Sequence, residues 1–248
     1  MFSIRIAELN IGINNKYEYV ERFCRAYIIG NDEPLDFTVD ITENDIDAEV
    51  ASSTINVSRG YAESICVYRE ICDKVLRDYN GLLFHSAVIE KDGKGYAFSA
   101  KSGTGKSTHI SLWKKAFGDS VHVVNGDKPI VRYINGDFLA FGTPWCGKEG
   151  YGTNTFVPLS AICFIERAKE NTINKLCAED AVSRVFTQIL FPSDIECFEK
   201  TAAFLDKMLK VVPCYLLGCN MDVEAAHVAY SGMPQWCNKY RIFSIQWL

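Results

Sequence analysis

Several features that would assign a protein class at once are missing from this sequence. Its ten cysteines include no CxxC pair and its four histidines are scattered, so neither a zinc ribbon nor a redox motif is present. No stretch approaches the ~18 consecutive apolar residues of a membrane span. The first residues lack the basic segment and long apolar run of a secretory signal. These absences predict a cytoplasmic protein that has no membrane partner.

Charge of one sign is not concentrated anywhere in the chain either. The 26 lysines and arginines are spread among 31 acidic residues, for a net charge of −5. Long nucleic acids need a basic patch, so we predict that none is a partner. At 248 residues and 48% hydrophobic content, the chain is long enough for one large domain or for a small one attached to a medium one.

The cysteines have mostly apolar neighbours, as in the run Ile162-Cys163-Phe164, where a reduced thiol acts as a small core residue. Without a secretory signal, free thiols are favoured over disulfides. Cys214 and Cys219 are close enough in sequence for a metal site, but no histidine cluster accompanies them.

What the sequence does contain is a phosphate-binding pattern at residues 100–107, which read Ala-Lys-Ser-Gly-Thr-Gly-Lys-Ser. The usual pattern, GxxxxGK[ST], has glycine where this chain has Ala100. The two glycines let backbone N–H groups curl around phosphate oxygens. Lys106 adds a mobile positive charge, and Ser107 offers a hydroxyl to magnesium.

The residues around this run favour a loop between a strand and a helix. Residues 95–99 are small, apolar and aromatic, as in a buried strand, and residues 107–117 have apolar positions at near-helical spacing. A helix start presents unpaired N–H groups and a positive dipole end, and both favour an anion. A Gly- and Ser-rich surface turn is the alternative, but it does not explain Lys followed by Ser at that spacing. The loop therefore predicts a nucleotide site.

The rest of the chain indicates an α/β protein with a separate N-terminal layer. Residues 1–60 contain strand-like runs at 3–9, 24–29 and 35–41 and form the predicted strand-rich subdomain. Apolar residues at helical spacing predict a bridging helix over 61–79, where the second predicted domain, 61–248, begins. The tail with Trp236 and Trp247 has no clear period. The other predicted strands are 82–89, 95–100, 122–124, 130–134, 138–141, 161–165 and 213–217. The other predicted helices are 178–190, a helix that begins at a Ser193–Glu196 capping box and runs toward residue 209, and 222–230.

Three residues outside the loop are candidates for chemistry. Asp127 ends the run Asn-Gly-Asp after a strand, and with the loop upstream a magnesium ligand or a base is favoured over an ordinary turn residue. His85 lies in an apolar strand, either as a core residue or as a contact to phosphate or acceptor. Lys148 ends a loop shaped by glycines and a proline and is either solvated or neutralises the transferred phosphoryl group. Arg132 and Arg167 flank predicted strands and either bind nucleotide or substrate or form surface ion pairs.

Taken together, these motifs resemble the catalytic domain of HPr kinase/phosphorylase, whose nucleotide fold is shared with ATP-dependent phosphoenolpyruvate carboxykinases. They are most similar to small HPr-kinase-like proteins of bacterial peptide clusters, among them kinases that phosphorylate a serine of lasso-peptide precursors. The resemblance covers roughly residues 80–220. The motifs that carry it are His85-Ser86, residues 98–107, Asn125-Gly126-Asp127, Lys128-Pro129, residues 142–148 and Val157-Pro158-Leu159.

The resemblance implies an α/β fold with a mixed β-sheet and a P-loop core of the HPr kinase/PEP carboxykinase type, and it implies ATP and Mg²⁺ as cofactors. The implied cofactor-binding residues are Ser102, Gly103, Thr104, Gly105, Lys106, Ser107 and Thr108, the implied metal ligands are Ser107 and Asp127, and the implied catalytic residues are Asp127, His85, Lys106 and Lys148. Two departures stand out. The relatives often have adjacent acidic residues where this chain has Gly126-Asp127. No segment resembles the Arg-Pro-Gly loop that HPr kinases use on their protein substrate, so HPr is not the expected target.

We therefore predict phosphoryl transfer from ATP to a hydroxyl, on a Ser or Thr of a peptide or protein or on a small hydroxylated molecule. One alternative is a carboxykinase, which needs a second metal site and an oxaloacetate pocket that the sequence does not show. The other is a nucleotide-binding accessory protein whose catalytic pair has decayed. The acceptor and the oligomeric state, including a homo-oligomer, stay open.

Overall fold

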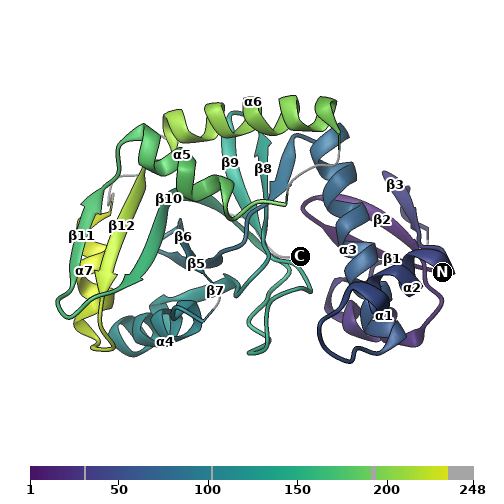
Figure 1. Ribbon diagram of the computed structural model, residues 1–248, viewed down its shortest axis with the longest axis horizontal. Coiled ribbons are helices and arrows are strands. Elements are labelled where there is room, and N and C mark those ends of the chain that lie inside the picture. Colours follow the sequence, from purple (N-terminus) through teal and green to yellow (C-terminus); the bar gives the residue numbers. More distant parts are fainter. Residues whose placement is uncertain (31, 102, 191–193, 234–248) are drawn as a thin grey trace.

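The computed structural model describes residues 1–30, 32–101, 103–190 and 194–233, and in this part the chain forms two β-sheets (Figure 1). One has three strands and the other nine. The predicted roles of Ser102 and Ser193, and the tail with Trp236 and Trp247, fall outside the described residues.

The N-terminal layer is a small sheet covered by helices. Its strands follow the order β1-β2-β3, with β1 antiparallel and β3 parallel to β2. The prediction was wrong in several places. The run 3–9 is not one strand, because a turn at Ala7 and Glu8 ends β1, and the helix Glu18–Phe23 was missed. The run 24–29 forms a 3₁₀ turn in place of a strand, and a helix was missed that begins after a capping box of Thr42 and Asp45. The elements are β1 (Phe2–Ile6), β2 (Leu9–Asn14), α1 (Glu18–Phe23), the 3₁₀ turn (Arg25–Tyr27), β3 (Phe37–Asp40) and α2 (Glu43–Ser52).

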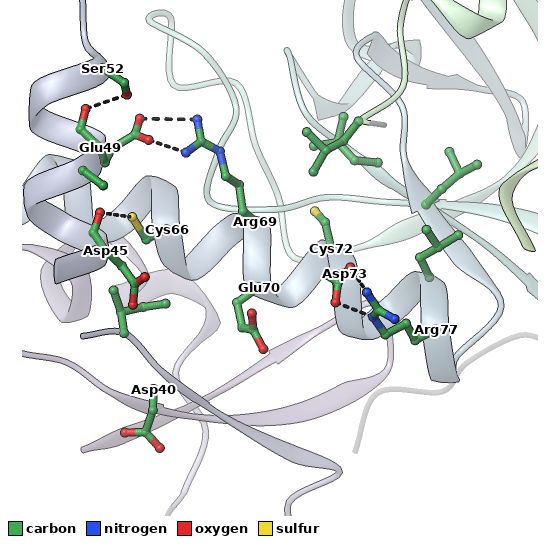
Figure 2. Close-up of a pocket in the computed structure, with 16 residues that line it drawn as sticks. Asp40, Asp45, Glu49, Ser52, Cys66, Arg69, Glu70, Cys72, Asp73 and Arg77 are labelled. Atoms are coloured by element: carbon green, nitrogen blue, oxygen red, sulfur yellow. Dashed lines mark hydrogen bonds and ion pairs between the residues drawn. The ribbon is translucent and has the colours of Figure 1, made fainter. Parts of the chain in front are cut away.

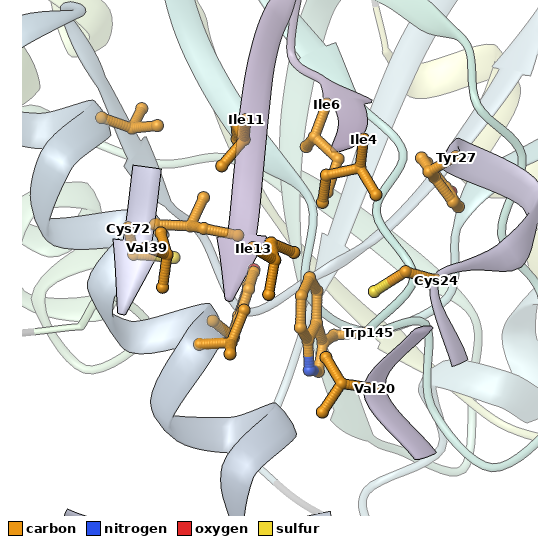
Figure 3. Packing of buried hydrophobic residues seen from close by; sticks show 14 of the residues in the cluster. Ile4, Ile6, Ile11, Ile13, Val20, Cys24, Tyr27, Val39, Cys72 and Trp145 are labelled. Atoms are coloured by element: carbon orange, nitrogen blue, oxygen red, sulfur yellow. The ribbon is translucent and has the colours of Figure 1, made fainter. Parts of the chain in front are cut away.

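Helix α3 (Arg59–Asp78) stands between the two sheets and confirms the predicted bridging helix (Figure 1). The Ser58 side chain caps its start by accepting a hydrogen bond from the Tyr61 N–H. The apolar face of α3 packs on the N-terminal sheet, and Trp145 reaches the same core from the other half of the chain (Figure 3). Its indole nitrogen donates to the carbonyl of Ser64 in α3, at 3.1 Å. The loop around Trp145 is therefore anchored to the bridging helix.

The second sheet is mixed, as predicted. Its strands follow the order β4-β8-β9-β10-β6-β5-β7, and β12 extends it from β10, with β11 beyond. The pairs β10/β6 and β10/β12 are parallel, whereas the other pairs are antiparallel. Strand β11 was not predicted. The strands are β4 (Gly81–Leu83), β5 (Ala87–Lys91), β6 (Lys94–Ser99), β7 (His122–Asn125), β8 (Ile130–Ile134), β9 (Asp137–Phe141), β10 (Phe156–Arg167), β11 (Thr172–Lys175) and β12 (Cys214–Cys219).

The predicted single strand 82–89 was wrong, because the chain leaves one part of the sheet and enters another between β4 and β5. The three N–H groups in between have three separate partners, so no ladder continues through them. Phe84 donates to Pro129 O, His85 to Gln188 O at 2.7 Å, and Ser86 to Asp127 O at 3.1 Å. This crossing places His85 beside Asp127.

Helices cover both faces of the large sheet. Along β6, Tyr96 and Phe98 point to the face that packs on α4 and α7, whereas Ala97 points to the face that packs on α5 and α6. The helix predicted over 178–190 ends at Phe186. The side chain of Asp194 caps the next helix by accepting a hydrogen bond from the Cys197 N–H. The helices are α4 (Lys106–Phe117), followed by a 3₁₀ turn (Gly118–Ser120), α5 (Ala178–Phe186), α6 (Ile195–Val211) and α7 (Glu224–Gly232).

Two findings bear on the compositional predictions. The nine cysteines in the described part of the chain are free thiols, and most of them are buried. Among the same residues, no helix is both long enough and apolar enough to cross a membrane.

Candidate functional site

The loop at residues 100–105 joins β6 to α4, where the sequence places it. Gly103 and Gly105 have φ angles of +77° and +132°, a region that favours glycine, and α4 begins directly afterwards at Lys106. Arg167, at the end of β10, holds this loop from outside. Its guanidinium donates to the carbonyl of Gly103 at 2.6 Å and to that of Thr104 at 3.1 Å. With their carbonyls turned toward Arg167, these residues are fixed in a single orientation beside the helix start.

One cavity of about 720 Å³ brings most of the predicted site residues together. It lies at the start of α4, where unpaired N–H groups and the helix dipole favour an anion. Thr104 does not line it, and Ser102 is outside the described residues. The lining residues are His85, Lys101, Gly103, Gly105, Lys106, Ser107, Thr108, Gly126, Asp127, Lys128, Gly147, Lys148 and Glu149.

His85, Lys106 and Asp127 form a polar cluster in this cavity. His85 Nε2 lies 3.1 Å from Asp127 Oδ1 and 2.8 Å from Lys106 Nζ. Lys106 Nζ lies 3.7 Å from the same carboxylate oxygen. The sequence had left His85 open between a core residue and a phosphate contact. Its ring faces the cavity and the cluster, so it is not a core histidine.

The protons of this cluster cannot satisfy all three contacts at once. An ammonium group only donates, so when Lys106 bonds to His85, the Nε2 atom must accept and its own proton lies on Nδ1. Nε2 donates to Asp127 only when Lys106 does not donate to Nε2. The position of Lys106 therefore controls whether Nε2 of His85 can donate a proton to the carboxylate of Asp127.

Lys128 completes the charge balance around Asp127, and the sequence reading did not give it a role. Its Nζ lies 2.9 Å from Asp127 Oδ2, on the opposite side of the carboxylate from His85. The signal was available, because a lysine directly after a candidate carboxylate can bend back onto it. Lys148 lines the same cavity but is exposed and has no hydrogen bond or ion pair within the described parts of the chain.

The pKa values of Asp127 and Lys106 are both lowered, but for different reasons. Burial alone would raise the pKa of Asp127, but the contacts with His85 and Lys128 outweigh it and hold the pKa of this carboxyl well below its usual range. Burial lowers the pKa of Lys106, and the nearby carboxylate opposes this change. Asp127 is therefore ionised at physiological pH.

The turn that carries Asp127 is held by the side chain of Asn125, which is fully buried. Its Oδ1 accepts hydrogen bonds from the N–H groups of Asp127 and Lys128, at 2.8 and 2.7 Å. Its Nδ2 donates to the carbonyl and to the hydroxyl of Thr143, both at 3.1 Å. Asn125 thus fixes the direction of the carboxylate and ties it to the loop at 142–148.

Gly126 has no room for a second carboxylate. A Cβ atom at this position would lie 2.6 Å from the carbonyl oxygen of Cys146, a distance that real Cβ atoms essentially never show. The oxygen belongs to the backbone, so relief would require movement of the loop that carries Trp145. The packing of this loop is therefore the physical reason for a glycine at position 126, where the relatives often have an acidic residue.

Ser107 and Asp127 fit a magnesium ion. Mg²⁺ binds through one or two carboxylates together with retained waters and substrate phosphates. A carboxylate and a hydroxyl in one cavity supply such oxygen ligands. Among the described residues, this cavity included, no group of three or more His, Cys, Asp and Glu side chains comes together that could hold a metal ion by itself.

The two arginines left open by the sequence have different surroundings. Arg132 donates to the carbonyls of Tyr79 and Ala7 and so links the large sheet to the N-terminal layer. Arg167 contacts the phosphate-loop backbone, as described above. Arg132 links the two layers, and Arg167 supports the backbone of the loop from outside the cavity.

Comparisons with known proteins give one family match. A family model described as "SynChlorMet cassette protein ScmC" matches residues 55–224, more than half of the chain. No curated protein matches. Among solved structures, the Hpr(Ser) kinase/phosphatase from Coxiella burnetii aligns with a TM-score of 0.35 and 8% identity, over 60% of this chain and 88% of that one.

Proposed function

The chain belongs to the family described as SynChlorMet cassette protein ScmC, and from this premise we propose that it transfers a phosphoryl group from ATP to a hydroxyl acceptor. A single observation carries the proposal. A glycine-containing loop at a helix start lies in one cavity with a lysine, a histidine and an ionised aspartate. Phosphoryl transfer needs mainly positioning and charge neutralisation, and these groups supply both.

The loop and Lys106 form the proposed binding site for the triphosphate. The N–H groups at the start of α4 and the glycines before it surround phosphate oxygens, and the lysine reaches the two outer phosphates. The Lys106 ammonium bonds to His85 Nε2 at 2.8 Å. A phosphate that draws the ammonium away leaves Nε2 free to donate to Asp127 or to the transferred group.

Asp127 is the proposed partner of the acceptor hydroxyl. A carboxylate whose pKa is held low is a weak base, so its main role is to orient the hydroxyl and to receive the proton late in the transfer. Ser107 and Asp127 would hold Mg²⁺, which supplies charge neutralisation at the phosphates when bound. Lys128 and Lys148 add positive charge at the cavity wall.

Transfer of label from ATP tests the proposal directly. The protein is incubated with Mg²⁺, γ-labelled ATP and a panel of hydroxyl acceptors. Because the family is described as a cassette protein, peptides encoded beside the gene come first in this panel. We expect acid-stable label on a hydroxyl. Binding of ATP without transfer to any acceptor would support the accessory-protein alternative and contradict the proposal.

A pair of matched variants separates a catalytic role for Asp127 from a general loss of charge. Asp127→Asn should lower transfer by about 10²–10⁴-fold while ATP binding changes little. Asp119→Asn is the control, since this exposed acid lies in the turn after α4 and outside the cavity. Equal turnover of the two variants would remove Asp127 from its assigned role.

A further inference from the structure

A second cavity, of about 680 Å³, lies between the N-terminal layer and the large sheet (Figure 2). Helices α2 and α3 form its walls and present residues at helical spacing. Asp45, Glu49 and Ser52 come from α2, and Arg69 and Asp73 come from α3. We call this cavity the α2–α3 groove. It shares no lining residue with the cavity around Asp127.

The α2–α3 groove is acidic. Five acidic residues line it against two arginines, and both arginines are already in ion pairs. Arg69 pairs with Glu49, and Arg77 pairs with Asp73 and with Asp194 outside the groove. The remaining acids are Asp40, Asp45 and Glu70.

These remaining acids leave negative charge open to a ligand. Asp45 is used in the cap of α2, and Asp40 accepts one hydrogen bond from Asn14. Glu70 has no hydrogen bond or ion pair among the residues that the structure describes, and Figure 2 shows its carboxylate between Asp40 and Asp73. The groove therefore attracts a cation.

The groove also has an apolar part, so a simple cation would not fill it. Leu190, which is 41% exposed, lines it together with Leu76 and with the buried Leu82 and Leu83. Exposed apolar surface beside acidic groups suits a ligand that carries both apolar and basic side chains. A polypeptide segment with lysine or arginine among aliphatic residues has this character.

A sheet edge borders the groove. Asp40 lies on β3, an edge strand of the small sheet, whereas Leu82 and Leu83 lie on β4, whose end is already bridged by Ile189 through Phe84. Edge strands leave backbone groups open to pairing with an added extended chain. The strand edge beside the groove therefore favours an extended peptide as the ligand.

The groove leads toward the transfer site. Leu83 is two residues before His85, a distance of at most about 7 Å along the chain. Leu190 is two residues after Gln188, whose carbonyl accepts the hydrogen bond of the His85 N–H. A chain that occupies this end of the groove needs only a few further residues to reach the cavity with Asp127.

We propose that the α2–α3 groove binds a basic, partly apolar, extended segment of the acceptor polypeptide and so selects the acceptor. This inference rests on the proposed function for the role of the segment, but the binding itself does not require transfer. It makes the acceptor a peptide or protein that carries a cationic stretch near the modified hydroxyl.

Peptide binding measured by fluorescence anisotropy tests the inference. The probe is a labelled peptide of about ten residues that alternates lysine and leucine and ends in serine. A second peptide has glutamate in place of each lysine. The full-length protein should bind the basic peptide at least tenfold more tightly than the acidic one, and added salt should weaken the binding.

Charge reversal in the groove provides the matched variants. Asp40→Lys combined with Glu70→Lys should weaken binding of the basic peptide about tenfold, and the milder Glu70→Gln about threefold. Glu21→Lys on α1 reverses an exposed acid outside the groove and should leave binding unchanged. Thermal melting of each variant shows whether it is folded, and Glu70→Gln keeps the test decisive if the double variant is not.

Four outcomes would overturn the inference. The first three are equal binding of the basic and acidic peptides, binding that the groove variants do not change, and no binding of the basic peptide at any accessible concentration. Tighter binding of a peptide with this chain's own sequence 234–248, which contains Lys239 and Arg241 and no acid, would also overturn it by assigning the groove to the tail. Groove-dependent binding without label transfer would sustain the groove and contradict only the proposed function.

Discussion

The two cavities beside the 84–86 crossing have opposite charge. The cavity at the start of α4 is lined by four lysines against two acids, whereas the α2–α3 groove is lined by five acids against two paired arginines. They share no lining residue, yet His85 and Leu83 are two residues apart. In the proposed reaction, the basic cavity takes the anionic donor and the acidic groove takes the cationic acceptor.

The opposite charges of the two cavities would keep the two proposed substrates apart until they react. A triphosphate is repelled by the groove, and a basic peptide is repelled by the four lysines of the cavity. The two ligands then meet only at the crossing between β4 and β5. Variants that change one cavity should leave the ligand of the other unaffected.

After that of Asp127→Asn, the largest expected effect comes from removing the lysine of the loop. Lys106→Ala deletes the cation that the loop directs at the phosphates and the partner of His85, so transfer should fall by about 10²–10³-fold and ATP binding should weaken. Labelled transfer and ATP titration measure both. The groove variant Asp40→Lys with Glu70→Lys should keep its ATP affinity, and a parallel loss there would break the comparison.

The next effect concerns the crowded position before Asp127. Gly126→Asp introduces a Cβ 2.6 Å from the Cys146 carbonyl and should destabilise the protein by about 1–3 kcal/mol. Gly30→Asp is the control, because a side chain there meets nothing within 4 Å. Chemical denaturation of both variants measures the difference. A Gly126→Asp protein as stable as Gly30→Asp would show that the loop accommodates a second carboxylate.

Helix α4, which begins at the basic cavity, also contains a buried histidine that should make stability depend on pH. Burial lowers the pKa of His109 to about 3, and its Nε2 accepts a hydrogen bond from Trp113. Since the unfolded chain takes up a proton near pH 6.5 and the folded one does not, stability falls as the pH drops below that value. Between pH 8 and pH 5 the loss should be about 2 kcal/mol.

The matched variant for this dependence is His109→Gln, which keeps an acceptor for Trp113. Denaturation at several pH values should show that this part of the acid sensitivity disappears in the variant. Equal pH profiles for wild type and variant would mean that His109 is protonated in the folded protein.

A smaller effect is expected at the outer support of the loop. Arg167→Ala removes two hydrogen bonds to the carbonyls of Gly103 and Thr104 and should weaken ATP binding about fivefold. Arg132→Ala also removes bonds to backbone carbonyls, but far from the loop, and should lower stability without changing ATP affinity. Isothermal titration distinguishes them, and similar ATP affinities for both variants would remove Arg167 from the site.

The smallest effect is expected for Lys148, which is exposed at the cavity wall. Lys148→Ala should lower transfer by no more than about threefold, because water screens an exposed charge. Steady-state kinetics at two salt concentrations should show that the difference shrinks at high salt. A loss as large as that of Lys106→Ala would place Lys148 against the phosphates.

Much of the fold could be predicted from the sequence because local patterns determine it. The bridging helix, the hairpin of β5 and β6, the hairpin of β8 and β9 and the strand–loop–helix around Lys106 all follow from periodicity and turn residues. The strand 82–89 failed because its apolar run continues through the crossing, and only the partners of the three N–H groups reveal the break. The run 24–29 failed because apolar content alone does not separate a strand from a buried turn.

In the candidate site, too, the residues that stand in local motifs could be predicted, and those that depend on tertiary contacts could not. His85, Asp127 and Lys106 could be chosen because each stands in a motif, and the fold brings all three within hydrogen-bond or ion-pair distance. Lys128 was missed because its contact depends on the turn held by Asn125. The α2–α3 groove could not be predicted, because one of its two walls, α2, was not predicted and because Leu190 comes from a distant part of the chain.

The central claim is tested most directly by a single-turnover measurement with γ-labelled ATP, Mg²⁺ and an acceptor peptide that carries a basic stretch. Wild type should place the label on the peptide hydroxyl, Asp127→Asn should bind ATP yet transfer at least 10²-fold more slowly, and the groove variant should transfer normally once the peptide is saturating. Wild type that binds both ligands and leaves the label on ATP would contradict the account.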